Sequence, residues 1–227
     1  MNLQAAVSKN GIALVPDVVP RDEASILMVK FDEKSPRRSR AGIRHLMSNE
    51  VVLEVAKSSR MLAIARSILG NGAFPFRATL FDKSFDANWL VVWHQDTALP
   101  LRVRTDMPGW GPWSVKEGIN YAHAPTRALD QIVALRLHLD DSTEKNGPLR
   151  VLPGTHKLGV LSDEEVERLS RELKAEDCLA SKGSVLAMRP LLIHSSSKSQ
   201  NDSPRRVLHI EYAASPSVGD GLELAIA

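Results

Sequence analysis

Apolar residues in the first 72 positions recur mainly three or four places apart, which is the spacing of one helix face. Prolines, glycines and capping residues such as Asn49 divide this part of the chain into short segments. The apolar run between Gly11 and Pro16 is too short for a helix and is typical of a strand. The pattern predicts a strand over 12–15 and helices over 22–31, 51–56 and 61–69, within a helical cover that spans 1–72.

After Gly72 the apolar residues gather in short runs that are bounded by turn residues. In the run over 132–139, apolar residues such as Leu135 and Leu137 alternate with Arg136 and His138, as in a strand. Similar runs predict strands over 76–81, 89–93, 132–139, 149–152, 184–188, 191–193 and 207–212. Many short strands separated by turns favour a β-sandwich or barrel over a fold of alternating strands and helices.

Two segments interrupt these strands. Ser162 can cap a helix over 162–175, in which Val166, Leu169 and Leu173 form the apolar stripe. Residues 97–125 are expected to form a long irregular insertion, and a loop of this length in a compact domain is more often a functional lid than a simple connection. We therefore expect one domain over 1–227, with a β core over 73–227.

Composition and charge exclude several classes of function. The 29 basic and 27 acidic residues nearly balance, and the densest basic patch, over 37–40, is typical of a solvated loop, so nucleic-acid binding is not indicated. No apolar run approaches the roughly 20 residues that span a bilayer, and the first residues lack the pattern of a signal peptide. The single cysteine, Cys178, is interpreted as structural and fits a reducing compartment. We expect a cytoplasmic protein without nucleic-acid or membrane partners, as a monomer or weak homodimer.

The chemistry of the chain is expected at His94 and Asp96, which follow the apolar run over 89–93. Residues i and i+2 of a strand point to the same side, so both side chains can face one metal ion. A His-x-Asp pair alone is weak, because the chain holds seven histidines and most such pairs bind no metal. The third ligand is predicted at His194, where the apolar residues 191–193 lead into a histidine and three serines. Two imidazoles and one carboxylate form the facial triad of non-haem iron oxygenases, although both histidines can also be unrelated core or surface residues.

An anion-binding residue is expected 11 or 12 residues after His194, at Arg205 or Arg206. Arginine can bind a carboxylate through two parallel hydrogen bonds, and in an oxygenase of this kind the carboxylate would be that of 2-oxoglutarate. Adjacent strand residues point to opposite faces, so one of the two arginines is expected inside and the other outside. Both can also be surface charges.

With these segments the chain resembles the phytanoyl-CoA dioxygenase family of Fe(II)- and 2-oxoglutarate-dependent oxygenases. The resemblance covers roughly residues 76–213 and is specific in the order and spacing of its motifs. The matching segments are WHQD at 93–96, LHLDD at 137–141, NGPLRVLPGTH at 146–156, HSS at 194–196 and RRVL at 205–208. It implies a mainly β fold, with a double-stranded β-helix (a cupin-like jelly roll) covered by N-terminal α-helices.

The family pattern also implies roles for single residues. His94, Asp96 and His194 match the catalytic iron ligands, Arg205 matches the 2-oxoglutarate arginine, and Ser196 matches a residue that assists the cosubstrate carboxylate.

Other residues are less clearly marked. Lys83 is a weaker candidate for binding 2-oxoglutarate, and His156 is expected to be structural rather than a fourth ligand. Halogenating relatives lack the carboxylate ligand, so the presence of Asp96 favours hydroxylation.

The implied activity is a dioxygenase that consumes O2 and 2-oxoglutarate, hydroxylates a small-molecule metabolite and releases succinate and CO2. Candidate substrate-binding residues lie in the insertion: Arg102, Trp110 and His123, and beside them Arg104, Trp113 and Tyr121, each of which can equally be packing or solvated surface. One alternative is a non-catalytic metal-binding jelly roll, either a sensor or a small-ligand binding protein. Another is a hydrolase or isomerase that uses a different divalent metal at the same triad.

Overall fold

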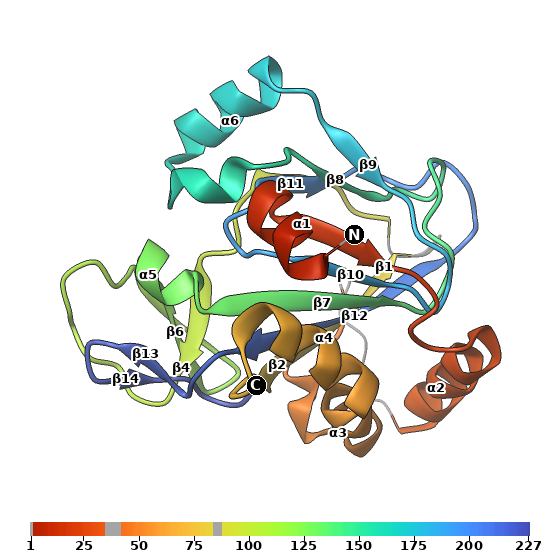
Figure 1. Cartoon of the computed structure of the whole chain (residues 1–227), viewed down its shortest axis with the longest axis horizontal. Helices are drawn as coiled ribbons and strands as arrows, with labels where there is room; N and C mark the ends of the chain where they lie inside the picture. Colours follow the sequence, from red (N-terminus) through yellow and green to blue (C-terminus); the bar gives the residue numbers. More distant parts are fainter. Residues whose placement is uncertain (1, 35–41, 84–87) are drawn as a thin grey trace.

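The structure, a computed structural model, describes residues 2–34, 42–83 and 88–227, and the basic run over 37–40 lies outside these ranges. Two antiparallel sheets face each other in its core (Figure 1). The five-stranded sheet has the order β1 (Ile12–Val15), β10 (Val185–Met188), β7 (Ile132–His138), β12 (Arg205–Ala213) and β2 (Phe74–Lys83). The four-stranded sheet has the order β3 (Val91–His94), β11 (His194–Ser196), β8 (Leu149–Val151) and β9 (Glu176–Cys178).

The alternation in β7 separates an outer apolar face from an inner polar face. Val133, Leu135 and Leu137 belong to the large apolar cluster that contains the helices. Arg136 and His138, on the opposite face, are also buried, because they point into the space between the two sheets. The space between the two sheets is therefore lined partly by polar side chains, as expected for a binding site inside the barrel.

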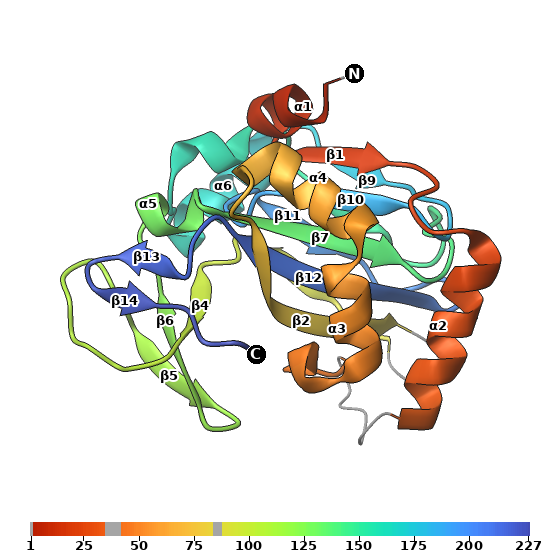
Figure 2. The same ribbon diagram turned by 60° about the horizontal axis from the view of Figure 1, so that its bottom comes forward.

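Helices cover the outer face of the five-stranded sheet, as Figure 2 shows for α3 and α4. The helices are α1 (Leu3–Asn10), α2 (Arg21–Lys34), α3 (Glu50–Lys57) and α4 (Ser59–Leu69), with a short 3-10 helix η1 (Leu46–Ser48) before α3. Asn49 caps α3 by accepting hydrogen bonds from the N–H groups of Val51 and Val52, as the sequence predicts. The strand β1 lies inside the predicted helical cover, but it pairs with β10 and forms the edge of the core sheet.

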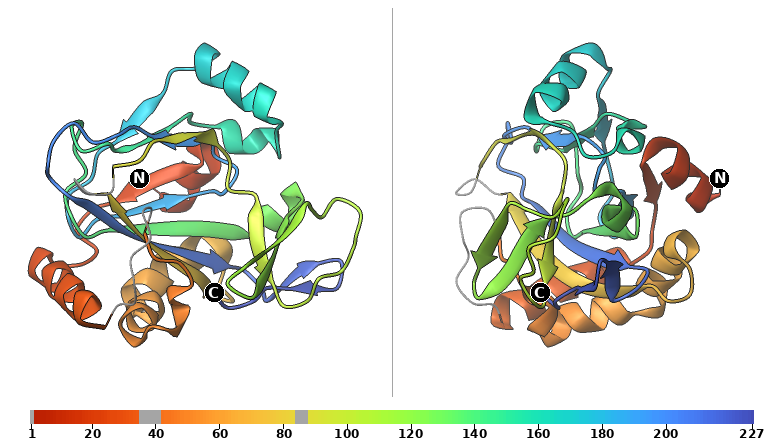
Figure 3. Two further views of the ribbon diagram at one scale, coloured as in Figure 1. Left: turned by 180° about the vertical axis from the view of Figure 1, so that it is seen from behind. Right: turned by 90° about the vertical axis from the view of Figure 1, so that its left-hand side faces the viewer.

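The insertion over 97–125 is ordered, so the expectation of an irregular segment is wrong. It contains β4 (Ala98–Leu101), β5 (Trp113–Lys116) and β6 (Ile119–His123), which form a three-stranded sheet of order β4-β6-β5. This sheet shares an apolar cluster with α5 (Thr126–Leu129) and with the C-terminal segment that holds β13 (Ser217–Gly219) and β14 (Leu222–Glu223). Figure 3 shows the two small sheets together at one end of the molecule. The C-terminal segment, which is distant in sequence, supplies the partners that order the insertion.

Two further expectations are corrected. Residues 191–193 form no strand, and β11 begins at His194 itself, because Gln95 takes up the Leu191 carbonyl through its side chain. The helix predicted over 162–175 is α6 (Asp163–Glu172), which is capped by Ser162 as predicted but ends earlier because β9 starts at Glu176. A short helix, η2 (Thr155–Leu158), precedes it.

Among the described residues, no helix has the length and apolar character required to cross a bilayer.

Candidate metal centre and active site

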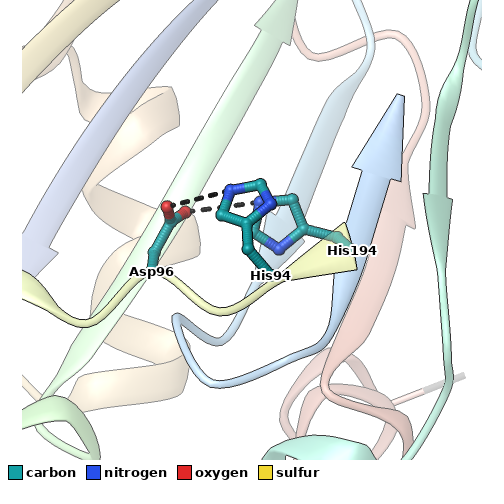
Figure 4. Close-up of side chains that lie close together, drawn as sticks. All are labelled: His94, Asp96 and His194. Carbon is teal, nitrogen blue, oxygen red and sulfur yellow. Dashed lines mark ion pairs between the residues drawn. The ribbon is translucent and has the colours of Figure 1, made fainter. Parts of the chain in front are cut away.

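Pairing between the four-stranded sheet's strands brings the two predicted histidine ligands together. His94, the last residue of β3, is the register partner of His194, the first residue of β11. Directly opposed residues of an antiparallel pair project to the same face, and the ring centroids lie 4.2 Å apart. Asp96 completes the group two residues beyond β3, where its backbone N–H donates to the carbonyl of Pro190 at 2.9 Å. Figure 4 shows the three side chains pointing toward one another.

Both imidazoles are held in the same orientation by their own backbone. The Nδ1 of His94 lies 2.8 Å from the carbonyl of Val92, and the Nδ1 of His194 lies 2.9 Å from the carbonyl of Leu192. A carbonyl can only accept, so each Nδ1 carries the proton and each Nε2 keeps a free lone pair. The two Nε2 atoms lie 3.7 Å and 3.6 Å from the two oxygens of Asp96. This arrangement presents three donor atoms to one point.

The charge states of His194 and Asp96 match this donor set. Burial lowers the pKa of His194 to about 4, so its imidazole is neutral at ordinary pH. Burial alone would raise the pKa of Asp96, but the two neighbouring imidazoles outweigh it and hold the pKa well below its usual range. For His94, burial is outweighed by the contacts with Asp96, and its pKa is raised. One atom each of His94, Asp96 and His194 lies within 4.8 Å of the other two, and nitrogen donors with a single carboxylate fit Fe(II).

Gln95, between the two ligands of the motif, locks the surrounding loops together. Its Nε2 donates to the carbonyls of Gly159 at 2.9 Å and Leu191 at 2.8 Å, and its Oε1 accepts from the N–H of Leu161 at 2.9 Å. The side chain therefore ties β3 to the segments before β11 and before α6. The sequence shows that Gln95 lies between two ligands, but it does not predict these three hydrogen bonds of the side chain.

A second register pair lies deeper in the barrel. Lys83 at the end of β2 pairs with Arg205 at the start of β12, and both side chains are buried. The Oγ of Ser196 joins them, accepting from Lys83 Nζ at 2.8 Å and from Arg205 at 3.1 Å. Arg205 also donates to the carbonyl of Asn146 at 3.3 Å. Ser196, Arg205, His94 and His194 line one cavity of about 100 Å3. Two of the cosubstrate candidates therefore line a cavity beside the triad, and Lys83 joins them through its hydrogen bond to Ser196.

An excess of buried positive charge lies in this cavity and directly beside it. Among the described residues, Lys83, Arg205 and Arg136 form no ion pair with a carboxylate. Burial and the nearby Arg205 lower the pKa of Lys83 to about 7, and burial and Arg136 lower the pKa of Arg205 to about 9. Unpaired buried cations are costly, and an anion bound in the cavity would offset this cost.

The adjacent arginines separate as the alternation of a strand requires. Arg205 points into the cavity, whereas Arg206 donates two side-chain hydrogen bonds to Asp140, at 2.7 Å and 2.8 Å. Arg136, which also lines the cavity, contacts His209 at 3.0 Å and was not predicted as a site residue. Its signal in the sequence is an arginine on the polar face of an otherwise apolar strand.

The predicted substrate residues of the insertion lie elsewhere. Trp110 is buried in the apolar cluster beside β13 and β14, and its indole N–H donates to Asp220 at 2.8 Å. Arg102 is exposed and pairs with Glu223, and His123 contacts Thr97 at 2.7 Å. None of these three lines either of the two cavities that contain His94 and Asp96. Of the insertion's other aromatic residues, Tyr121 does line one of them, and Trp113 does not.

Two other residues take positions that agree with structural roles. His156 lies 3.2 Å from the carbonyl of Ser8 in α1 and is not part of the metal-ligand group. The Cys178 thiol is half-buried and its pKa is raised to about 12 by burial, so it is a poor nucleophile.

Comparison with known proteins gives a family and several similar proteins. The family model described as phytanoyl-CoA dioxygenase (PhyH) matches residues 8–207. L-proline trans-4-hydroxylase of Streptomyces griseoviridis is 23% identical over 190 residues, which cover 72% of this chain and 63% of that protein. The epimerase SnoN, solved in complex with Fe3+, α-ketoglutarate and nogalamycin RO, superposes with a TM-score of 0.71 at 16% identity, covering 93% of this chain and 82% of SnoN.

EctD from S. alaskensis, solved with 2-oxoglutarate and 5-hydroxyectoine, superposes with a TM-score of 0.68 at 17% identity, covering 92% of this chain and 74% of EctD. The fold is thus the double-stranded β-helix that the sequence predicts, carrying a site of two histidines and one carboxylate. The chain belongs to the phytanoyl-CoA dioxygenase family.

Proposed function

We propose that this protein is an Fe(II)- and 2-oxoglutarate-dependent dioxygenase that hydroxylates a small-molecule metabolite. In the overall reaction, 2-oxoglutarate and O2 would yield succinate and CO2, and one oxygen atom would be inserted into a C–H bond of the substrate. The observation that carries the proposal is the triad of His94, Asp96 and His194 directly beside a cavity lined by buried cations without carboxylate partners. The chain spans 63% of the length of the curated relative that it matches.

In this proposal the two Nε2 atoms and the Asp96 carboxylate hold the iron on one side. When bound, iron supplies the activation of O2 that accompanies oxidative decarboxylation of 2-oxoglutarate. The backbone bonds of Val92 and Leu192 keep both Nε2 lone pairs aimed at the metal, as outer-shell partners do in other metal sites. Since His194 is neutral before binding, no proton has to leave it when the metal arrives.

The residues at the far end of the cavity would orient the cosubstrate. Arg205 can bind the distal carboxylate of 2-oxoglutarate, with Ser196 and Lys83 as additional donors. Binding of this dianion would neutralise the unpaired buried charge, which favours the bound state over the empty one. The surrounding walls, Phe81, Trp89, Val91 and Leu149, are apolar and limit the access of water to the reacting atoms.

The relatives support a small-molecule substrate, because L-proline trans-4-hydroxylase and the ectoine-related complex of EctD both concern small metabolites. A cytoplasmic location belongs to this proposal as well, supported by the single cysteine. A monomer or weak homodimer without nucleic-acid or membrane partners stays a prediction.

Anaerobic titration with Fe(II) and 2-oxoglutarate tests the proposal. A weak visible charge-transfer band that requires both components is expected in the wild-type protein. Asp96→Ala and His94→Ala should each abolish iron binding and succinate formation, whereas Asp177→Ala, an exposed carboxylate of β9, should retain both. Iron-dependent succinate production that persists in both triad variants would overturn the assignment. Absence of the band in the wild type would favour a binding protein, or a hydrolase or isomerase with another metal.

A further inference from the structure

A second cavity opens on the other side of the triad. It has a volume of about 250 Å3 and shares His94, Asp96 and Phe81 with the inner cavity. The remaining lining residues come from β2, β5, β6, β12 and the segment before η1: Arg44, Arg77, Thr79, Lys116, Tyr121 and His209. Its position beside the metal ligands and away from Arg205 makes it the space in which a substrate would meet the oxidant. Pockets for drug-sized ligands span roughly 300–1,000 Å3, so this cavity fits a small metabolite.

The lining of this outer cavity carries unbalanced positive charge. Arg77 is neutralised, because its guanidinium pairs with the buried carboxylate of Glu211 and also donates to the carbonyl of Ala98 at 2.9 Å. Arg44 and Lys116 have no such partner among the carboxylates of the described part of the chain. Asp96 is the acidic residue of the lining, and the metal would occupy it. The cavity therefore retains two uncompensated cations.

Contacts around Tyr121 hold these two cations at the cavity. Lys116 Nζ lies 4.8 Å from the centre of the Tyr121 ring, and the partial burial of Lys116, with Arg44 and Arg77 nearby, lowers its pKa. The Tyr121 hydroxyl contacts His45 at 2.8 Å, and the two rings stack.

The backbone beside Arg44 is under strain. His45 has a left-handed backbone with φ of 56°, which is unfavourable for a residue other than glycine. The Tyr121 and Glu117 contacts compensate for this strain and fix the segment that carries Arg44 against the β5–β6 hairpin.

We propose that this cavity selects a small anionic substrate, a metabolite with a carboxylate or phosphate group that Arg44 and Lys116 bind while its C–H bond faces the triad. The role of the bound anion as a substrate rests on the proposed oxygenase function. Anion binding itself does not require iron or 2-oxoglutarate. Two cations at the outer rim and the triad at the inner end would set both the orientation and the charge of the substrate.

Binding of inorganic phosphate and of acetate to the metal-free protein tests the inference. Thermal unfolding is followed against the concentration of each anion at constant ionic strength, and affinities are obtained from the stabilisation. The Arg44→Gln/Lys116→Gln double variant should bind about tenfold more weakly than the wild type. The matched control is Arg102→Gln/Arg104→Gln, which removes two exposed arginines of the same insertion that do not line the cavity. Anion binding at Arg205 is common to all three proteins and cancels in the comparison.

Each outcome decides the inference. Weakened binding of phosphate, of acetate or of both in the double variant, but not in the control, supports it and identifies the preferred anion. Equal binding in all three proteins overturns it. The single variants Arg44→Gln and Lys116→Gln, both at exposed positions, should each show part of the loss, which separates a local effect from general unfolding.

The reaction provides a separate test. Small carboxylic acids and phosphate esters are compared with the uncharged amides and alcohols of the same skeleton, and iron-dependent succinate release is measured. Stimulation by charged members only is expected, and equal stimulation by the uncharged partners would contradict the inference. If the wild type forms no succinate and shows no charge-transfer band, the proposed function is wrong. The phosphate and acetate measurements would still show whether Arg44 and Lys116 bind an anion.

Discussion

His94 and His194 are register partners across β3 and β11, although 100 positions separate them in the sequence. Lys83 and Arg205 stand in the same relation across β2 and β12. Each half of the site is therefore a cross-strand pair, one of imidazoles and one of cations. Strand pairing fixes the position of such side chains relative to each other, because a shift by one residue would turn them to the opposite face. The β-ladders of the core thereby fix most of the site's geometry.

Replacement of Arg205 should weaken cosubstrate binding specifically. Arg205→Gln removes the fork-shaped donor at the end of the inner cavity, and we expect KM for 2-oxoglutarate to rise by about tenfold to a hundredfold. Arg205→Lys should recover only part of the loss, because a lysine cannot donate two parallel hydrogen bonds. Initial rates of succinate formation at varied 2-oxoglutarate concentration provide the measurement.

The neighbouring arginine offers a matched control for this experiment. Arg206→Gln removes the same charge from the other face of β12, where Arg206 pairs with Asp140. It should lower the free energy of unfolding and leave KM for 2-oxoglutarate close to that of the wild type. A similar rise of KM in both variants would show that general charge, not the position of Arg205, attracts the cosubstrate.

The protein should take up a proton at Lys83 when it binds 2-oxoglutarate. Its pKa in the empty site is about 7, so at pH 8 most of the side chains are neutral. A bound carboxylate favours the charged form and raises this pKa, so a proton must be taken up on binding at pH 8. At pH 6 the lysine is already charged, and the uptake should disappear. Calorimetric titration of the Ni(II)-loaded protein in buffers of different ionisation enthalpy measures the effect.

Lys83→Met is the decisive variant for this proton uptake. It should abolish the difference between buffers at pH 8 and weaken 2-oxoglutarate binding at both pH values. If the variant still takes up a proton at pH 8, the uptake belongs to another group and the prediction for Lys83 is wrong.

Loss of the Gln95 side chain should disturb both stability and metal binding. Gln95→Ala leaves the carbonyls of Gly159 and Leu191 and the N–H of Leu161 without this partner. We expect a loss of about 1–3 kcal/mol in the free energy of unfolding. Fe(II) affinity should fall by about tenfold, because outer contacts orient the ligands. Gln131→Ala is the control, since Gln131 makes one exposed hydrogen bond to Arg127, and it should change neither quantity.

One buried hydroxyl should contribute measurably to the attachment of the helical cover. Tyr212 on β12 is fully buried, and its OH donates to the carbonyl of Ala56 in α3 at 2.8 Å. Tyr212→Phe keeps the ring but leaves that carbonyl unpaired, which should cost about 1–2 kcal/mol in urea unfolding. Because Tyr212 lines neither cavity, kcat and KM for 2-oxoglutarate should stay unchanged. A large change in KM would mean that the cover is coupled to the site.

Hydrophobic spacing predicted the elements whose faces differ in polarity, such as the helices over 51–56 and 61–69 and the strand over 132–139. It was wrong where long-range partners decide the local structure. Residues 97–125 look irregular in sequence, but they form strands because β13, β14 and α5 bury their apolar side chains. Residues 191–193 look like a strand, but Gln95 takes the Leu191 carbonyl through its side chain. For Trp110 the sequence left a substrate contact and packing equally open, and the C-terminal segment gives its ring a packing position.

The sequence by itself determined the family, the jelly-roll class and the residues of the triad, because ligand identity and spacing are written in single segments of the chain. Only the tertiary structure decided that His94 and His194 oppose each other, that Arg205 and not Arg206 faces the cavity, and that Arg44 and Lys116 share a cavity with Asp96. These relations depend on strand register and on contacts between distant segments. Local propensity and spacing do not encode such contacts, because the packing of the whole chain selects them.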